Sequence, residues 1–297
     1  MFEWIKKIFS INNKDYNDWS PLPKRQGDAL VKSDFLYSIH LLFKYKWLCH
    51  LSAQLDETIY FLLRTPERKR LLKKLLKQFK FVSYNEDDEY IRKIKEHIES
   101  VWCCNASNTI IMATKRQTDR EPDGSSTLVY HLQAEMTSWN SDAFFNAYIP
   151  KCDIVKNLKH NIILCDDFIG SGWTINNRVR DLKVRYPNAN VYVVAIAGMH
   201  QSKTNYLDKL DVPYFAACWL DAGLKEGSTD YKTMLEIESL LHPQYNTYSL
   251  EECSMGWGKS MALYKNAKYR IPNSCFPIFW WGKLKNGREF NSLFRRT

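Results

Sequence analysis

Apolar residues recur at intervals of three and four through the first hundred positions, and this spacing is typical of amphipathic helices. It predicts one long helix, or a broken pair of helices, over Asp34–Leu63. Thr65 and Pro66 have the residue types of an N-cap and a first helical position, so they predict a helix over Glu67–Gln78. A further helix is expected over Asn85–Trp102, with an asparagine N-cap and acidic residues in its first turn.

After Cys104 the pattern changes to short, continuous apolar runs separated by helical segments. The expected strands are Thr109–Thr114, Ala143–Ile149, Asn161–Asp166, Val191–Ala197 and Val212–Leu220. The expected helices between them are Ser126–Glu135, Thr174–Tyr186 and Ser202–Leu210. Uninterrupted apolar strands that alternate with helices predict an α/β fold, with a mainly parallel sheet of roughly five strands and helices on both faces.

The pattern divides the chain into three parts. Residues 1–104 form a helical and basic N-terminal region, residues 105–220 form the α/β core, and residues 221–297 form an accessory region. The accessory region returns to helical periodicity, for example around Met261 and Leu263, and ends in the aromatic cluster Phe276–Trp281. Large aromatic side chains mostly pack in cores, so we interpret this cluster as core rather than as a platform for nucleic-acid bases.

The chain has 297 residues and a net charge of +9. A basic protein invites a nucleic-acid hypothesis, but a site for phosphorylated small molecules also requires cations. In Glu67–Gln78 the leucines form one stripe and lysines and arginines occupy the rest. Two interpretations stay open for this helix. It is a core-packed helix with a solvated cationic face, or it is a docking surface for nucleic acid or an acidic partner.

Several features favour a cytoplasmic protein without a membrane span. No apolar run approaches the ~20 residues that cross a bilayer. Met1–Phe9 has helical spacing and reads as a small docking helix or, alternatively, a membrane-surface helix, and the polar residues 10–33 read as a linker or surface loop. The eight cysteines contain no C-x-x-C pair, which favours reduced thiols, and neither they nor the histidines suggest a zinc site.

The most informative stretch is Ile162–Thr174, where an apolar run is followed by two acids, a loop with glycines and hydroxyls, and a helical segment. Glycines allow backbone N–H groups to turn toward an anion, and the start of the helix adds its positive end. Ser171 and Thr174 add hydroxyl donors. Asp166 and Asp167 are suited to accept hydrogen bonds from ribose hydroxyls or to hold a divalent cation. This chemistry fits a sugar phosphate, whereas a strand-end capping pair beside a tight turn is the simpler alternative.

The same stretch resembles the phosphoribosyl-pyrophosphate signature of the type I phosphoribosyltransferases. Phe168 and Gly170 depart from it, because the family usually has a smaller apolar residue at the first position and Thr, Ser or Ala at the second. The resemblance implies that Asp166 and Asp167 are catalytic. The substrate-binding residues that it implies in this stretch are Phe168, Ile169, Gly170, Ser171, Gly172, Trp173 and Thr174. It also implies a magnesium ion, held mainly by the diphosphate of the substrate.

In that family the loop after the first core strand holds pyrophosphate, and by position this loop is Lys115–Ser126. Lys115 and Arg116 would neutralise the diphosphate, and Gly124, Ser125 and Ser126 would form a second anion-binding helix start. A merely solvated basic loop is the alternative. The short interval between Ile149 and the signature leaves little room for the family's closing hairpin, so another segment must exclude water from the site.

The signature occurs together with a late Pro-Ile-Phe-Trp at 277–280 and a terminal Leu-Phe-Arg-Arg at 293–296. This combination is similar to bacterial phosphoribosyltransferase-like proteins of defence and conflict systems, including retron-associated ones. The resemblance implies a hood-like role for the accessory region, and an effector with glycosyltransferase or related nucleotide N-glycosidic chemistry. The alternative is a regulatory module that senses a ribose phosphate or nucleotide without turnover. It would contact nucleic acid, or a reverse-transcriptase complex with RNA and DNA, through Glu67–Gln78.

Overall fold

The fold is described from a computed structural model of the 297-residue chain. It describes residues 40–42, 44–51, 65–116, 123–149, 160–294 and 296. The chain forms two compact units, Met1–Lys46 and Trp47–Thr297, and the second unit contains the features discussed below. The expectations for Met1–Phe9, for residues 10–33 and for most of Asp34–Leu63 lie outside the described residues.

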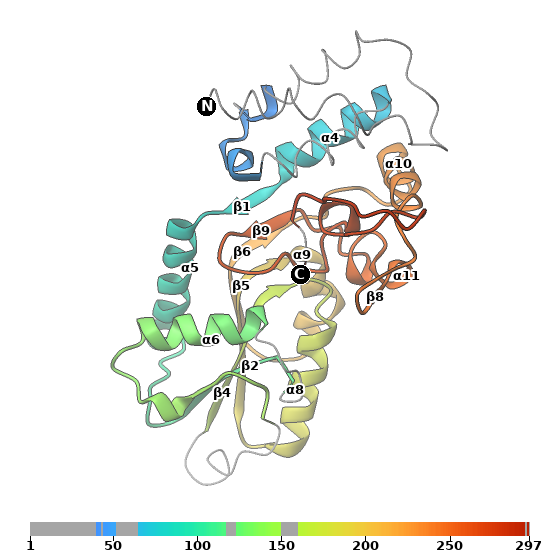
Figure 1. Ribbon diagram of the computed structural model, residues 1–297. Helices are drawn as coiled ribbons and strands as arrows, with labels where there is room; N and C mark the ends of the chain where they lie inside the picture. The colour runs from blue at the N-terminus through green and yellow to red at the C-terminus, as the bar shows by residue number, and fades with distance from the viewer. Residues whose placement is uncertain are drawn as a thin grey trace. The chain divides into compact units, whose positions relative to one another are not determined.

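A five-stranded parallel sheet forms the centre of the second unit (Figure 1). Its strands, in spatial order, are β3 (Phe144–Phe145), β2 (Thr109–Ala113), β4 (Asn161–Ile169), β5 (Asn190–Met199) and β6 (Tyr214–Leu220). Every neighbouring pair is parallel. The α/β class and the parallel sheet predicted from the apolar runs are therefore confirmed.

All five strands differ from their predicted bounds by at least one residue, and the differences in β4 and β3 concern the site and the sheet edge. β4 continues through Asp166 and Asp167 to Ile169, because it pairs with β5 as far as the Ile169–Gly198 register. β3 has only two residues, and it lies at the edge of the sheet, where a strand has a single neighbour. Pairing at this edge resumes at Tyr148, whose N–H donates to the carbonyl of Lys115 at 2.6 Å.

Helices cover both faces of the sheet, as predicted. α5 (Tyr84–Glu96) and α6 (Gly124–Glu135) pack on one face, and α8 (Trp173–Arg185) and α9 (His200–Asn205) pack on the other (Figure 1). The core under α8 is formed by side chains at every second position of the central strands, such as Ile162 and Leu164 of β4. Among the described residues no helix is long and apolar enough to cross a membrane.

Several helix ends differ from the predictions because side chains cap them elsewhere. Ser83, not Asn85, caps α5, since its hydroxyl accepts from the Glu86 N–H while the Glu86 side chain accepts from the Ser83 N–H. The helix then continues as a π-helical turn, His97–Val101. Asp123 caps α6, so that helix begins two residues before the predicted Ser126.

The basic helix α4 (Pro66–Gln78) begins as predicted, because the Thr65 hydroxyl accepts from the Arg68 N–H at 3.3 Å. Its four leucines, 71, 72, 75 and 76, are all buried. Lys74 forms a 2.9 Å ion pair with Asp230 of α10 (Thr229–Glu238), whereas Lys73 remains exposed. The helix is therefore core-packed along its leucine stripe, and a docking role for its cationic face stays a prediction.

The helical prediction for Met261 and Leu263 was wrong. These residues precede β9 (Tyr264–Asn266), which pairs in parallel with β1 (Lys80–Val82). The two apolar residues are separated by two positions, which is the period of a strand, and the neighbouring β1 supplies the backbone partner. The three-part division of the chain stays a prediction, although this pairing joins its N-terminal and C-terminal parts.

Beyond α10, the C-terminal region consists of short elements. Besides β9, they are β7 (Gln244–Tyr245), β8 (Tyr248–Ser249), α11 (Leu250–Cys253) and the 3-10 turns η7 (Trp257–Lys259) and η8 (Pro277–Phe279). The aromatic cluster near the end of the chain is core, as predicted: Phe276, Phe279, Trp280 and Trp281 are fully buried. The indole N–H groups of Trp280 and Trp281 donate to the carbonyls of Cys275 and His242, each at 3.0 Å.

Candidate functional site

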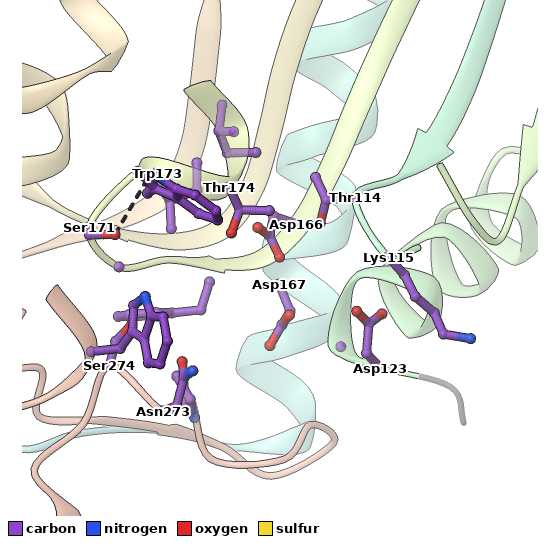
Figure 2. Close-up of a pocket in the computed structure, with 18 of the residues that line it drawn as sticks. Thr114, Lys115, Asp123, Asp166, Asp167, Ser171, Trp173, Thr174, Asn273 and Ser274 are labelled. Atoms are coloured by element: carbon purple, nitrogen blue, oxygen red, sulfur yellow. Dashed lines mark hydrogen bonds between the residues drawn. The ribbon is translucent and has the colours of Figure 1, made fainter. Parts of the chain in front are cut away.

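A cavity of about 400 Å³ lies at the carboxyl ends of β2 and β4, between the sheet and the C-terminal region (Figure 2). This is the edge at which open parallel sheets bind ligands. The predicted residues that line it are Lys115, Arg116, Gly124, Asp166, Asp167, Phe168, Ile169, Gly170, Ser171, Gly172, Trp173 and Thr174. The two sequence stretches chosen as candidate binding loops therefore meet at one cavity.

Ser125 and Ser126 do not line the cavity. The Ser125 hydroxyl donates to Oδ1 of Asp123 at 2.8 Å and accepts from the Lys115 N–H at 3.1 Å. Ser126 completes the cap of α6, because its hydroxyl accepts from the Asp123 N–H at 2.9 Å and its N–H donates to Oδ1 of Asp123 at 3.0 Å. These two residues shape the start of α6, and of this helix start only Asp123 and Gly124 face the cavity.

Asp166 and Asp167 are consecutive residues of β4, so their side chains leave opposite faces of the strand. The side chain of Thr114, directly after β2, lies near Asp166 (Figure 2) and acts to lower the pKa of that carboxyl group. Asp167 lies against the first residue of α6, where a Cβ atom on Gly124 would be only 2.0 Å from its carboxyl carbon. A glycine at 124 is thus required for this close approach.

Burial and mutual repulsion make both carboxyl groups difficult to ionise. Burial, and then the charges of Asp167 and Asp123, raise the pKa of Asp166 well above its ordinary value. Burial, and then the charge of Asp123, raise the pKa of Asp167 to about 7, with the positive charge of Arg296 acting in the opposite direction. A ligand that brings hydroxyl donors or a cation into the cavity would favour the ionised forms.

The loop after β4 leads directly into α8. Gly172, with a φ of 88°, is the N-cap of this helix, and the Trp173 N–H donates to the Ser171 hydroxyl at 3.3 Å. The helix has 13 residues, so its N-terminus carries the partial positive charge that favours anions. Trp173 stands at this end of the cavity with half of its side chain exposed.

Both departures from the phosphoribosyltransferase signature are explained by the C-terminal region. The ring of Phe168 stacks on Tyr264 of β9, with 4.8 Å between ring centroids. A Cβ atom on Gly170 would lie only 1.9 Å from the Ser274 hydroxyl oxygen. A larger apolar residue at 168 and a glycine at 170 are therefore what the packing of this region against β4 requires.

Several residues that line the cavity were not anticipated from the sequence. They are Thr114, Asp123, Ile175, Asn177, Arg178, Trp257, Arg270, Ile271, Pro272, Asn273, Ser274 and Arg296. Arg178 lies one helical turn after Thr174, and this spacing could have indicated that both residues lie on the same face of the helix. The Nε of Arg178 donates to the carbonyl of Thr114 at 3.2 Å. The C-terminal residues had no such signal, because they reach the cavity only through tertiary packing.

The C-terminal region covers the side of the cavity that faces the signature loop. Within it, the Trp257 N–H donates to the carbonyl of Asn273, and the Ala262 N–H donates to the carbonyl of Ser274, each at 3.0 Å. Asn273 and Ser274 lie across the cavity from Asp166 (Figure 2). Among the residues that the structure describes, no three His, Cys, Asp or Glu side chains are grouped so as to hold a metal ion.

Solved structures of two phosphoribosyltransferases are similar to this chain. The xanthine-guanine-hypoxanthine phosphoribosyltransferase of Helicobacter pylori has 14% sequence identity and a TM-score of 0.32, over 48% of this chain and 83% of that one. The orotate phosphoribosyltransferase of Aeropyrum pernix has 11% identity and a TM-score of 0.25, over 53% and 74% of the two chains. No curated protein matches significantly.

A family model described as PRTase-CE matches residues 46–296, which is most of the chain. The match includes the sheet, the signature loop and the C-terminal region that closes the cavity. The chain therefore belongs to the PRTase-CE family, a phosphoribosyltransferase-like family of conflict effectors.

Proposed function

We propose that this protein binds phosphoribosyl pyrophosphate or a related nucleotide in the cavity and cleaves or transfers its ribosyl group. One observation carries the proposal. Two carboxyl groups and an anion-binding helix start meet in a single cavity, at the carboxyl edge of a parallel sheet. The family assignment supports this reading, because it is phosphoribosyltransferase-like.

Each part of the cavity has a role in this proposal. Asp166 and Asp167 accept hydrogen bonds from the ribose hydroxyls and stabilise positive charge that develops on the ribosyl carbon as the leaving group departs. The loop Gly170–Gly172 and the start of α8 hold the 5′-phosphate through backbone N–H groups. Lys115 and Arg116, with the start of α6 at Gly124, neutralise the diphosphate.

A magnesium ion fits this arrangement when it arrives with the substrate. Magnesium usually keeps several waters and binds through one or two carboxylates together with phosphate oxygens. The substrate diphosphate would hold most of the ion, and Asp166 and Asp167 would offer nearby carboxylates, because they lie in the same cavity as the proposed diphosphate residues. The ion would supply charge neutralisation at the diphosphate.

At the level of the cell, we propose that the protein is an effector of a bacterial anti-phage system of the retron type. The conflict-effector family supports this role. A nucleic-acid partner, or a reverse-transcriptase complex with RNA and DNA, would bind the cationic face of α4, on which Arg70, Lys73 and Lys77 are exposed.

A second candidate is a module that senses a ribose phosphate or nucleotide without turnover. The short interval between Ile149 and the signature favours it, because this interval leaves little room for the closing hairpin with which phosphoribosyltransferases exclude water.

The two candidates are separated by titrating magnesium and phosphoribosyl pyrophosphate into the protein, and by measuring diphosphate release with nucleobases and nucleotides present. We expect binding, and we expect Asp166→Asn to weaken it by about 10-fold or more, the loss typical of a hydrogen bond to a charged group. Asp142→Asn, at an exposed position, is the matched control. Binding without release, also with RNA–DNA present, would favour the sensor, and no binding would contradict both candidates.

A further inference from the structure

Arg296 reaches the cavity from the C-terminal end of the chain. Two backbone contacts hold the chain there. The Phe294 N–H donates to the carbonyl of Phe279 at 2.7 Å, and the hydroxyl of Tyr245 donates to the carbonyl of Arg296 at 3.1 Å. The backbone of the last described residue is thus fixed against the aromatic core.

The guanidinium group of Arg296 is oriented by aromatic rings. Its central carbon lies 5.0 Å from the ring centroid of Tyr248 and 5.5 Å from that of Trp280. Such cation–π contacts fix the plane of the guanidinium while leaving its N–H donors available at the edges. Trp280 is fully buried, so this support is rigid.

One donor of this guanidinium has no acceptor. Nη1 of Arg296 is buried and has no hydrogen-bond partner among the residues that the structure describes. Leaving a buried donor unpaired is unfavourable, and buried polar groups in proteins nearly always have partners. Because Arg296 as a whole is only partly buried and lines the cavity, its positive charge can still act on an anionic ligand there.

The surroundings indicate which part of a ligand the guanidinium charge of Arg296 would face. The positive charge of Arg296 acts on Asp167, whose side chain lies against Gly124 at the start of α6. The proposed 5′-phosphate position lies elsewhere, at the start of α8, which follows the signature loop. In the proposed binding mode, the part of the ligand that would lie next to Asp167, near the start of α6, is the diphosphate.

We propose that Arg296 binds the diphosphate of the phosphoribosyl ligand from the C-terminal side of the cavity, while Lys115 and Arg116 bind it from the end of β2. This inference rests on the proposed function. The planar guanidinium suits two-point binding of phosphate oxygens. The C-terminal region would then be part of the binding site itself, in addition to covering it.

The test is isothermal titration calorimetry of the full chain with three probes: phosphoribosyl pyrophosphate, inorganic diphosphate and ribose 5-phosphate, each with magnesium. We expect Arg296→Gln to weaken binding of the two diphosphate-containing probes by about 10-fold or more, since hydrogen bonds between charged groups are the strong ones. Ribose 5-phosphate should bind within about 2-fold of wild type. Arg296→Lys should recover only part of the loss, because lysine retains the charge without the planar fork.

Arg180→Gln is the matched control. It removes the same charge at an exposed position of α8, and all three probes should bind it as they bind wild type. Unchanged diphosphate binding by Arg296→Gln would overturn the inference. An equal loss for ribose 5-phosphate would overturn it too, because it would show a general collapse of the cavity. Failure of wild type to bind any probe would instead contradict the proposed function.

Discussion

At the scale of single residues, Asp167 reduces the stability of the ligand-free protein. Its pKa is raised to about 7, mainly by burial, while an ordinary aspartate has a pKa of ~3.9. Between these two pH values the folded state binds a proton that the unfolded state has lost. The free energy of unfolding therefore falls as the pH rises through this window. Ionisable groups with strongly shifted pKa values are common at ligand-binding and catalytic sites.

We expect Asp167→Asn to stabilise the ligand-free protein at pH 8 and to have a smaller effect at pH 5, because asparagine does not ionise. The increase in melting temperature at pH 8 should be at least about 2 °C, the change that roughly 1 kcal/mol produces in a large domain. Thermal unfolding from pH 5 to pH 8 measures it.

Asp142→Asn, at an exposed position, is the control and should shift the melting temperature little at any pH. A shift for Asp167→Asn that is the same at pH 5 and pH 8 would contradict the titration argument.

At the scale of elements, the contact between the end of β4 and the segment around Ser274 determines which residue fits at position 170 of the signature loop. A Cβ atom on Gly170 would lie 1.9 Å from the Ser274 oxygen and 2.7 Å from its Cβ atom. The family's usual small side chain at this position is thus excluded by a segment that lies a hundred residues later in the chain. A larger residue at position 170 therefore requires a smaller residue at position 274.

Gly170→Ala is therefore expected to destabilise the protein by about 1–3 kcal/mol, the usual cost of overpacking. Adding Ser274→Gly removes both clashing atoms, so the double variant should recover most of that loss. Urea unfolding of the two single variants and the double variant measures the coupling. Additive effects of the two substitutions would show that the contact does not exist in solution.

At the scale of the whole second unit, the buried aromatic residues of the C-terminal region connect the core to the site. Trp280 packs on Trp281 with 5.1 Å between ring centroids, and it also supports the guanidinium of Arg296. Phe79, which directly follows α4, contacts Phe279 and Phe294, so the N-terminal part of this unit joins the same cluster. If Arg296 binds the ligand as proposed, stability and ligand binding depend on one set of side chains.

Trp280→Ala should lower the free energy of unfolding by about 3–5 kcal/mol, as expected for a large cavity in a core. It should also weaken diphosphate binding, because Arg296 loses its aromatic support. Tyr130→Ala, at a largely exposed tyrosine, is the control and should change neither property appreciably. A Trp280→Ala protein with wild-type stability would show that the aromatic cluster is not a core in solution.

The sequence by itself determined the parallel α/β sheet, the start of α4 and the stretch that forms one wall of the cavity. These features depend on local chemistry: continuous apolar runs, the Thr65 cap, and acids and glycines adjacent along the chain. Helix ends and short elements were less accessible, as the Ser83 cap and the strand β9 show, because a competing cap or a distant partner strand decides them.

Only the tertiary structure decided how the cavity is completed. Ser274 and Arg296 lie more than a hundred residues after Asp166 and Asp167, and no spacing rule connects such distant positions. It also decided that the hydroxyls of Ser125 and Ser126 bond to Asp123, the N-cap of α6, and that Phe168 and Gly170 fit the C-terminal region. The physical reason is that the pattern of residues along the chain determines local backbone geometry and burial. A binding site, in contrast, forms where side chains from separate elements come into contact after folding.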